Sequence, residues 1–92
     1  MTNNNYQYIE EILLRLLGLL LAVFTESEKS EVQEFIDVGE YGLALETLVD
    51  IVYEEDKQIS SEALRLVQEL AEVMQMDANT LEAKLRGHVG AE

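Results

Sequence analysis

Apolar residues recur at spacings of three and four positions along most of the sequence, which is the period of helices with one buried face. The clearest case lies between Gly39 and Asp56, where we predict a helix that begins at Glu40 or Tyr41 and ends near Glu55. Its buried face would consist of Ala44, Leu45, Leu48, Val49, Ile51 and Val52. The opposite side of this helix is acidic and would face away from the core.

A longer helix is predicted at the start of the chain, from about Tyr6 to Phe24, with a cap supplied by residues 3–5. From Leu16 onward it is apolar almost all the way round, so most of its sides should be covered. The cover could be the centre of the bundle or the interface with a second copy, and we favour the centre of the bundle. Gly18 would let a neighbouring helix approach closely.

A capping signal separates this first helix from the second. Thr25 and Glu28 have the T-x-x-E spacing of a capping box, which predicts a helix that begins at Ser27 or Glu28 and ends at Val38. Gly39 follows directly, at the position where a glycine in the left-handed conformation commonly ends a helix. The second and third helices are therefore predicted to be joined by a tight turn.

Two more helices are predicted in the rest of the sequence. Ser60 or Ser61 would cap a fourth helix that reaches about Gln75. A second polar cap within residues 77–80 would start a short fifth helix that ends near Arg86. The sequence has no proline and only five glycines, so little in it would break these helices or make turns for a sheet.

The predicted fold is a single all-α domain over residues 1–92, a small bundle of four main helices and a short C-terminal one. Gly87 would end the last helix, and residues 87–92 are predicted to form a frayed tail. His88 lies in this tail and is the one histidine of the sequence. We expect its side chain to be solvated rather than to act as a metal ligand or a base.

The charge narrows the possible partners. The sequence has 19 acids and six bases, a formal charge of −13. DNA, RNA and anionic membranes are not expected as partners, because binding to them relies on basic residues that neutralise phosphate groups. A basic protein is the natural complement, since opposite fields speed encounter. The alternative is that the acidity serves only solubility.

The N-terminal sequence indicates a cytoplasmic protein. The first five residues lack the basic region of a secretory signal. The apolar run from Ile12 to Phe24 is interrupted by Arg15 and is shorter than the ~20 residues that span a bilayer. The absence of cysteine excludes disulfides, a thiol nucleophile and a cysteine zinc site. A cytoplasmic location without a membrane segment is the expectation.

The acids are not spread evenly along the chain. From Ser30 to Asp56 there are nine acids and no lysine or arginine. Glu46, Asp50 and Glu54 are spaced four apart, and such like-charge pairs oppose helix formation by a few tenths of a kcal/mol each. We interpret the segment as a docking surface for a basic partner, with a merely solvated face as the alternative. The candidate contact residues are Glu34, Asp37, Glu40, Tyr41, Glu46, Asp50, Tyr53, Glu54, Glu55 and Asp56.

Two tyrosines are included because tyrosine combines a large apolar ring with a hydrogen-bonding tip, which suits an interface anchor. Tyr53 flanks the acidic side of the predicted third helix. For Tyr41 we favour packing at the edge of the core over contact with a partner.

No catalytic, metal or cofactor site is predicted. The segment from Asp50 to Asp56 lacks the spacing and the glycine of a calcium loop, and neither a P-loop, a dinucleotide fingerprint nor a zinc-protease motif occurs. Paired carboxylates such as Glu46 and Asp50 could do acid–base chemistry only in a cleft that shifts a pKa strongly. We therefore expect no enzymatic activity.

One local motif is specific enough to suggest a family. Residues 39–48 read G-E-Y-G-L-A-L-E-T-L, are preceded by F-I-D at 35–37, and run on through Y-E-E-D at 53–56 to a serine-capped helix after Ile59. This pattern resembles the MafI family of bacterial immunity proteins, which are relatives in role of the immunity proteins of contact-dependent growth inhibition. The resemblance covers residues 32–76, about half of the chain. The first helix matches only in its apolar character.

The resemblance implies a cytoplasmic antitoxin that binds the toxic C-terminal domain of a secreted polymorphic toxin. Such toxin domains are often nucleases with basic surfaces, so an acidic helix face would suit them. The resemblance does not identify the toxin. The alternative function is a homo-oligomeric scaffold or adaptor organised by the leucine-rich first helix, and the sequence leaves open whether the protein is a monomer or a homodimer.

Overall fold

The computed structural model, which describes residues 5–90, contains five helices and confirms the predicted all-α bundle of four main helices and a short last one. Apart from one isolated bridge, the described residues form no β-structure. None of the helices in this range combines the length and the apolar character needed to cross a bilayer. The helices are α1 (Asn5–Leu19), α2 (Glu26–Asp37), α3 (Tyr41–Glu54), α4 (Ser61–Val73) and α5 (Ala78–Leu85).

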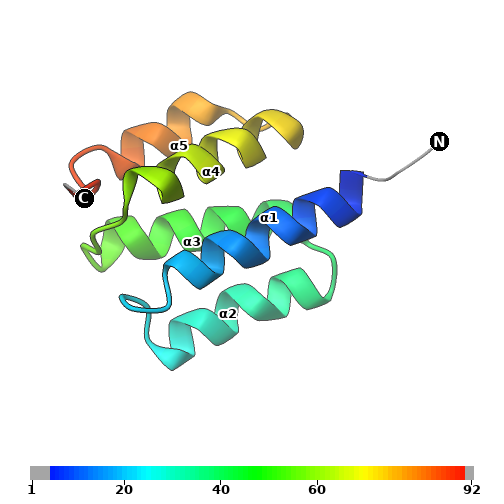
Figure 1. Ribbon diagram of the computed structural model, residues 1–92, viewed down its shortest axis with the longest axis horizontal. Helices are drawn as coiled ribbons and strands as arrows, with labels where there is room; N and C mark the ends of the chain where they lie inside the picture. The colour runs from blue at the N-terminus through cyan, green and yellow to red at the C-terminus, as the bar shows by residue number, and fades with distance from the viewer. Residues whose placement is uncertain (1–4, 91–92) are drawn as a thin grey trace.

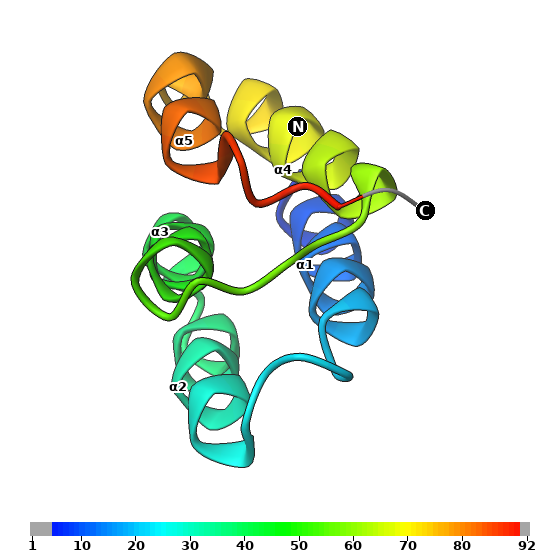
Figure 2. The same cartoon turned by 90° about the vertical axis from the view of Figure 1, so that its left-hand side faces the viewer.

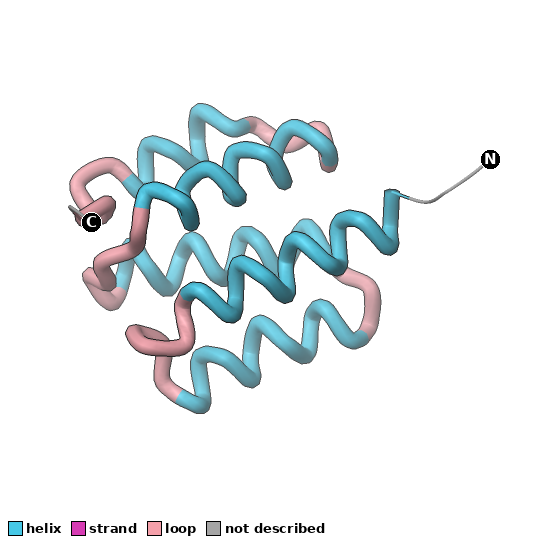
Figure 3. Tube along the Cα trace, in the orientation of Figure 1, coloured by secondary structure: helices cyan, strands magenta, loops and turns pink. Residues whose placement is uncertain are grey.

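Successive helices run back and forth along the long axis of the bundle, so that the loops gather at its two ends (Figures 1 and 3). Seen end on, the helices form two layers (Figure 2). One layer contains α1 and α4, and the other contains α2, α3 and α5, with α3 in the middle. One side of α3 therefore faces the other layer, and its opposite side lies at the surface.

The core lies between these two layers and receives side chains from all five helices. The six residues predicted for the apolar face of α3 are all buried, which confirms that face. The buried side chains of α1 are spaced as a single helical stripe, and they comprise Ile9, Ile12, Leu13, Leu16 and Leu17. No charged or polar residue of the described chain is fully buried, so apolar packing dominates the stability of the bundle.

The helix starts follow the predicted caps. The Oγ1 of Thr25 accepts a hydrogen bond from the backbone N–H of Glu28 at 3.1 Å, and the carboxylate of Glu28 accepts one from the N–H of Thr25 at 2.9 Å. Ser60 caps α4 and Asp77 caps α5 through their side-chain oxygens. Gly39 has φ +82°, the left-handed conformation predicted for it. These signals are local, so they can be identified without knowledge of the tertiary structure.

The end of α1 differs from the prediction. The helix ends at Leu19 rather than at Phe24, and residues 20–24 form a turn. This turn is held by short-range backbone bonds, such as the one from the N–H of Leu20 to the carbonyl of Leu17 at 3.0 Å. Leaving the helix lets the chain reverse toward α2 while Phe24 still reaches the core.

The apolar second half of the predicted first helix is therefore only partly buried. Leu16, Leu17 and Leu20 lie in the core, as the favoured interpretation requires. Leu21 is 54% exposed, and two more leucines are also exposed on α1. Gly18 lies on the exposed side, and a Cβ added there would meet nothing within 4 Å. The close helix approach predicted for this glycine is thus wrong within the monomer.

The predicted fraying of the tail is wrong for residues 87–90. The N–H of Ile59 donates to the carbonyl of His88 at 2.8 Å, and the N–H of Gly90 donates to the carbonyl of Ile59 at 2.9 Å. These bonds form a parallel bridge between Ile59 and Val89 that attaches the tail to the α3–α4 loop. The last two residues of the predicted tail, 91–92, lie outside the described part of the chain.

His88 is also not solvated as predicted. Its side chain is only 13% exposed, and its Nδ1 lies 3.0 Å from the backbone carbonyl of Lys57. The carboxylate of Asp56 is 3.4 Å from the same nitrogen. The bridge between Ile59 and Val89 holds the backbone of His88 against the loop, which explains why its ring is covered.

Candidate functional site

The outer side of α3 carries the three acids predicted to lie together. Glu46, Asp50 and Glu54 follow one another at four-residue intervals on the side opposite the buried face. We call these three residues the acidic stripe. Glu46 and Glu54 are exposed, and Asp50 is half-exposed. Because α3 is the middle helix of its layer, the stripe runs along the middle of one surface of the protein (Figure 2).

The stripe has an internal cation that the sequence analysis did not anticipate. The Nζ of Lys84 on α5 lies 2.6 Å from the Oδ1 of Asp50. The hydrogen bond with Asp50 raises the pKa of Lys84, and the charges of Glu54 and Glu46 raise it further. Both partners are about two-fifths exposed, so the pair adds at most about 1 kcal/mol to stability. One positive charge therefore faces three negative ones, and the stripe stays acidic.

The remaining predicted residues of α3 gather at its C-terminal end. Glu55 and Asp56 are exposed, and Asp56 has φ +54°, which ends the helix in the left-handed region. The ring of Tyr53 is 54% exposed and meets the ring of His88 edge-on, with 6.2 Å between the centroids. Tyr53 is thus exposed beside the acids, and its role as an interface anchor stays a prediction.

The other predicted acids lie at the opposite end of α3, around its junction with α2. Glu34, Asp37 and Glu40 are all exposed. Asp37 accepts a hydrogen bond from the side-chain amide of Gln33 at 2.9 Å, while Glu40 occupies the N-cap position of α3 without a capping bond from its side chain. The candidate surface is therefore about 20 Å long, with a cluster of acidic residues at each end of α3 and the acidic stripe between the two clusters.

Tyr41 belongs to the edge of the core, as the favoured prediction states. It is partly buried against the core cluster, and its hydroxyl donates to the Oε1 of Glu10 on α1 at 2.9 Å. This hydrogen bond is the main reason that the pKa of Tyr41 is raised. The ring of Tyr6 lies beside it, with 6.3 Å between the centroids.

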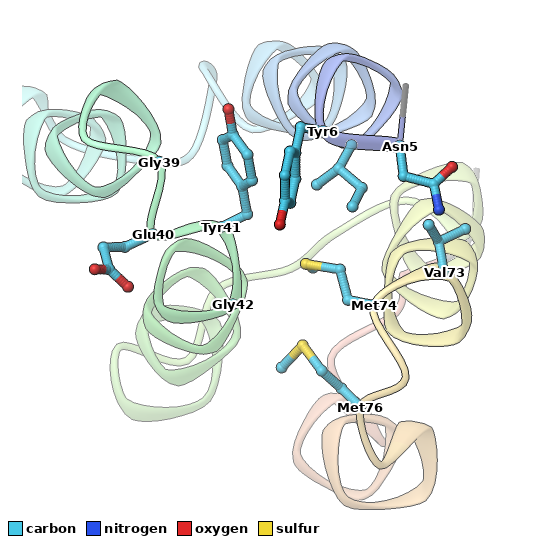
Figure 4. A pocket seen from close by; sticks show the side chains of 10 residues that line it. Asn5, Tyr6, Gly39, Glu40, Tyr41, Gly42, Val73, Met74 and Met76 are labelled. Atoms are coloured by element: carbon cyan, nitrogen blue, oxygen red, sulfur yellow. The ribbon is translucent and has the colours of Figure 1, made fainter. Parts of the chain in front are cut away.

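Tyr6 and Tyr41 are part of an open groove that the sequence analysis missed. The groove has a volume of about 650 Å³ and lies at the end of the bundle where α1 and α3 begin and α4 ends. Figure 4 shows the two tyrosine rings side by side, with the methionine side chains of the α4 end below them. Its lining consists of Asn5, Tyr6, Ile9, Gly39, Glu40, Tyr41, Gly42, Val73, Met74 and Met76.

Several exposed apolar side chains also lie outside the predicted site. Leu43 is half-exposed and precedes the acidic stripe by three residues on the same side of α3. Leu14, Leu19 and Leu21 are exposed on α1 and on the turn that follows it, and we call them the α1 leucines. Helical periodicity could have identified Leu43, since it falls off the apolar face of α3.

The described residues include no cluster of three or more histidine, cysteine, aspartate or glutamate side chains placed to hold a metal ion. The exposed groups of this surface are carboxylates, the ring of Tyr53 and the side chain of Leu43.

Comparisons with protein-family models, with curated proteins and with solved structures give no match to this chain. The resemblance of residues 32–76 to the MafI immunity proteins accordingly stays a prediction.

Proposed function

We propose that this protein is an immunity protein that binds a basic toxin domain through the acidic surface of α2 and α3 and thereby neutralises it. The observation that carries the proposal is the charge of residues 30–56, which contain nine acids and no lysine or arginine. Eight of these acids are exposed on α2, on α3 or beside them, and the ninth, Asp50, is half-exposed. The local motif that resembles the MafI family lies in the same segment.

The physical basis of binding is complementary charge. A formal charge of −13 creates a field that attracts a basic protein and speeds its encounter with the acidic surface. A nuclease toxin needs basic residues to hold the phosphates of its substrate. Binding of the acidic surface to those residues would block the nuclease sterically and replace the substrate charge.

Exposed apolar groups beside the acids complete the surface. Leu43 lies at the start of the acidic stripe and Tyr53 near its end. Interfaces commonly combine a few apolar or aromatic anchors with a surrounding ring of polar residues. The acids would then select a basic partner, and Leu43 and Tyr53 would supply buried area.

The test is a charge reversal of the stripe, in the variant Glu46→Lys/Asp50→Lys/Glu54→Lys. Attraction becomes repulsion at the centre of the interface, so affinity for the toxin domain encoded next to this gene should fall by about 2–5 kcal/mol. Isothermal titration measures this affinity, and protection of cells that express the toxin measures the function. Thermal stability should be equal or slightly higher, because like-charge repulsion along α3 is relieved.

The matched control is Glu11→Lys/Glu72→Lys/Glu82→Lys, with acids on α1, α4 and α5. In each triple variant, three negative charges are replaced by three positive ones, so the formal charge changes from −13 to −7 in both. The control should bind within about threefold of the native protein, a loss that reflects only the weaker long-range field. If the stripe variant folds and still protects cells, the docking surface is wrong.

A second candidate function, a homo-oligomeric scaffold or adaptor, is favoured by the α1 leucines. These exposed side chains lie in a segment, residues 12–24, that contains no acid and only one base. Two copies would meet there with the least electrostatic repulsion. Light scattering of the native protein and of Leu14→Glu/Leu21→Glu tests this: a dimer that becomes a folded monomer supports the candidate, and a native monomer excludes it.

A further inference from the structure

The groove at the start of α1 and α3 contains an aromatic pair that the proposed function has not used. Tyr6 is 68% exposed although its ring lies beside that of Tyr41. The two rings are inclined by 43° rather than stacked face to face, and the high exposure of Tyr6 leaves much of its ring accessible at the groove. An exposed aromatic face next to carboxylates is a favourable environment for a cation.

The charges around the groove all have one sign. Glu40 lies at its edge with its side chain directed away from the tyrosine rings (Figure 4), and Glu10, which does not line the groove, accepts a hydrogen bond from the hydroxyl of Tyr41. No lysine or arginine lines the groove. The N-termini of α1 and α3 lie there together with the C-terminus of α4, and α2 ends just before Gly39, so two positive and two negative helix ends largely offset one another. The two carboxylates therefore determine the local potential.

We propose that this groove binds an arginine side chain of a basic protein partner, with the guanidinium on the face of Tyr6 and the aliphatic stem along the two methionines. The identity of the partner rests on the proposed function, but the chemistry of the groove does not. Arginine fits better than lysine, because its planar guanidinium stacks on an aromatic ring and pairs with carboxylates through two parallel hydrogen bonds.

The walls of the groove suit the rest of an arginine side chain. Met74 and Met76 are partly exposed and present flexible thioether chains toward the tyrosines (Figure 4). Methionine adapts its shape to a bound apolar chain, and the arginine stem can lie on such a surface while its head reaches carboxylates. Gly39 and Gly42 leave the side of α3 open, since neither has a side chain. The groove is also continuous with the acidic surface, because Glu40 belongs to both.

The first experiment uses small probes and does not need the toxin. N-acetyl-arginine amide, N-acetyl-lysine amide and N-acetyl-leucine amide are titrated into the native protein labelled with ¹⁵N and with ¹³C at the methionine methyls. The arginine probe should shift the amides of Gly39 and Gly42 and the methyls of Met74 and Met76. It should bind at least about fivefold more tightly than the other two probes. Equal binding of the leucine probe, or no shifts in the groove, would overturn the proposal.

Two variants separate the groove from general charge attraction. Tyr6→Ala removes the aromatic face at an exposed position, where the fold is little affected. Gly42→Leu fills the groove, since a Cβ at residue 42 would lie 4.0 Å from the sulfur of Met76, an ordinary contact. Each variant should lower the affinity for the arginine probe about fivefold or more. Tyr8→Ala is the control. Tyr8 lies on the same helix, but it is hydrogen-bonded to Glu69 of α4 and does not line the groove. This variant should change the affinity for the arginine probe less than about twofold.

The same variants distinguish a failure of the proposed function from a failure of the proposed arginine site. Gly42→Leu should weaken the binding of the toxin domain about tenfold or more, because it fills the groove while leaving the acidic stripe intact. If the stripe reversal abolishes toxin binding and Gly42→Leu does not, the proposed function stands and the arginine site is wrong. If the arginine probe binds the groove but no toxin domain binds the protein, the groove chemistry stands and the proposed function fails.

Discussion

The outer faces of α1 and α3 are opposites, although both helices bury an apolar stripe in the same core. On α1 and its following turn, the surface of residues 12–24 has three exposed leucines, one arginine and no acid. On α3, the outer face has the acidic stripe and one exposed leucine, Leu43. The outer face of α3 is therefore mostly acidic, whereas the outer face of residues 12–24 is mostly apolar.

This difference bears on what the acids are for. Acids that served only solubility would be most useful near exposed leucines, since an apolar patch promotes association. Here residues 12–24 contain none, although Glu11 lies one turn before Leu14, while α2 and α3 carry acids that repel one another within a single helix. Their concentration on α2 and α3 supports the proposed docking surface, which the charge reversal tests.

The largest expected effect is a difference in stability between substitutions on the buried side and on the exposed side of the turn after α1. Leu20 is 1% exposed and its neighbour Leu21 is 54% exposed. Leu20→Ala should lower the free energy of unfolding by about 3 kcal/mol, because it leaves a cavity in the core. Leu21→Ala should change it by less than about 0.5 kcal/mol. Urea denaturation measures both, and similar losses would mean that the outer face is also covered, for example by a second copy.

The second effect concerns the ion pair between Lys57 and Glu28, which lies beside Phe24 at the end of the turn after α1. Lys57 lies over the ring of Phe24, with Nζ 5.9 Å from its centroid, and its Nζ is 3.0 Å from the Oε1 of Glu28. Both charged side chains are less than one-fifth exposed. The backbone bond from Thr25 and, after it, the interaction with Lys57 lower the pKa of Glu28. Glu28→Gln keeps the capping geometry and removes the charge, so it should cost about 1 kcal/mol at pH 7.

The pH dependence of this loss follows from the direction of the shift. A carboxyl whose pKa is lowered by folding stabilises the fold above its ordinary value of 4.5, and this contribution is lost as the pH falls through the lower folded value. The difference between the native protein and Glu28→Gln should therefore persist from pH 7 to about pH 5 and shrink as the pH falls further below 4.5. A difference that grew on acidification would contradict the assignment. Thermal denaturation at several pH values gives the measurement.

A smaller effect is expected from the cation that faces the acidic stripe. Lys84→Gln should lower stability by less than about 1 kcal/mol, because the pair with Asp50 is largely exposed. The same change removes a charge that a basic partner has to displace, so affinity for that partner should rise a fewfold. Arg65→Gln removes the same charge from α4 and is the control. A fall in affinity would show that Lys84 itself contacts the partner.

The smallest effect is that of salt. Repulsion among the acids of α2 and α3 is screened over about 10 Å at 0.1 M salt, so moderate sodium chloride should raise the Tm by a few degrees. The stripe reversal should show a smaller rise, because its repulsion is already reduced. A Tm that falls steadily with salt would mean that attractive pairs such as Lys57–Glu28 outweigh the repulsion.

The parts of the fold that sequence could predict are those determined by neighbouring residues. The buried face of α3, the capping box at Thr25 and the left-handed Gly39 depend on spacing within a few positions. The end of α1 was missed because nothing in the run of leucines marks Leu19 as its last residue. Only the reversal toward α2, which the packing of Phe24 requires, ends the helix there.

The candidate site was predicted in the same uneven way. The acids of the stripe were placed together because they share one helix. Lys84 is 34 residues from Asp50, and the groove combines side chains from α1, α3 and the end of α4, so neither could be read from local spacing. The attachment of the tail was missed for the same reason, since Ile59 and Val89 pair only in three dimensions.

The late position of Lys84 in the sequence has a consequence for the protein as it is made. The ribosome adds about 5–20 residues per second, so Lys84 follows Asp50, 34 residues earlier, by about 2 to 7 seconds. Until Lys84 has been added and α5 has folded, the acidic stripe lacks its internal cation. The apolar residues of α3 and α4 that later receive Leu81 and Leu85 are also uncovered. The acidic stripe therefore reaches its final charge balance only when α5 packs against α3.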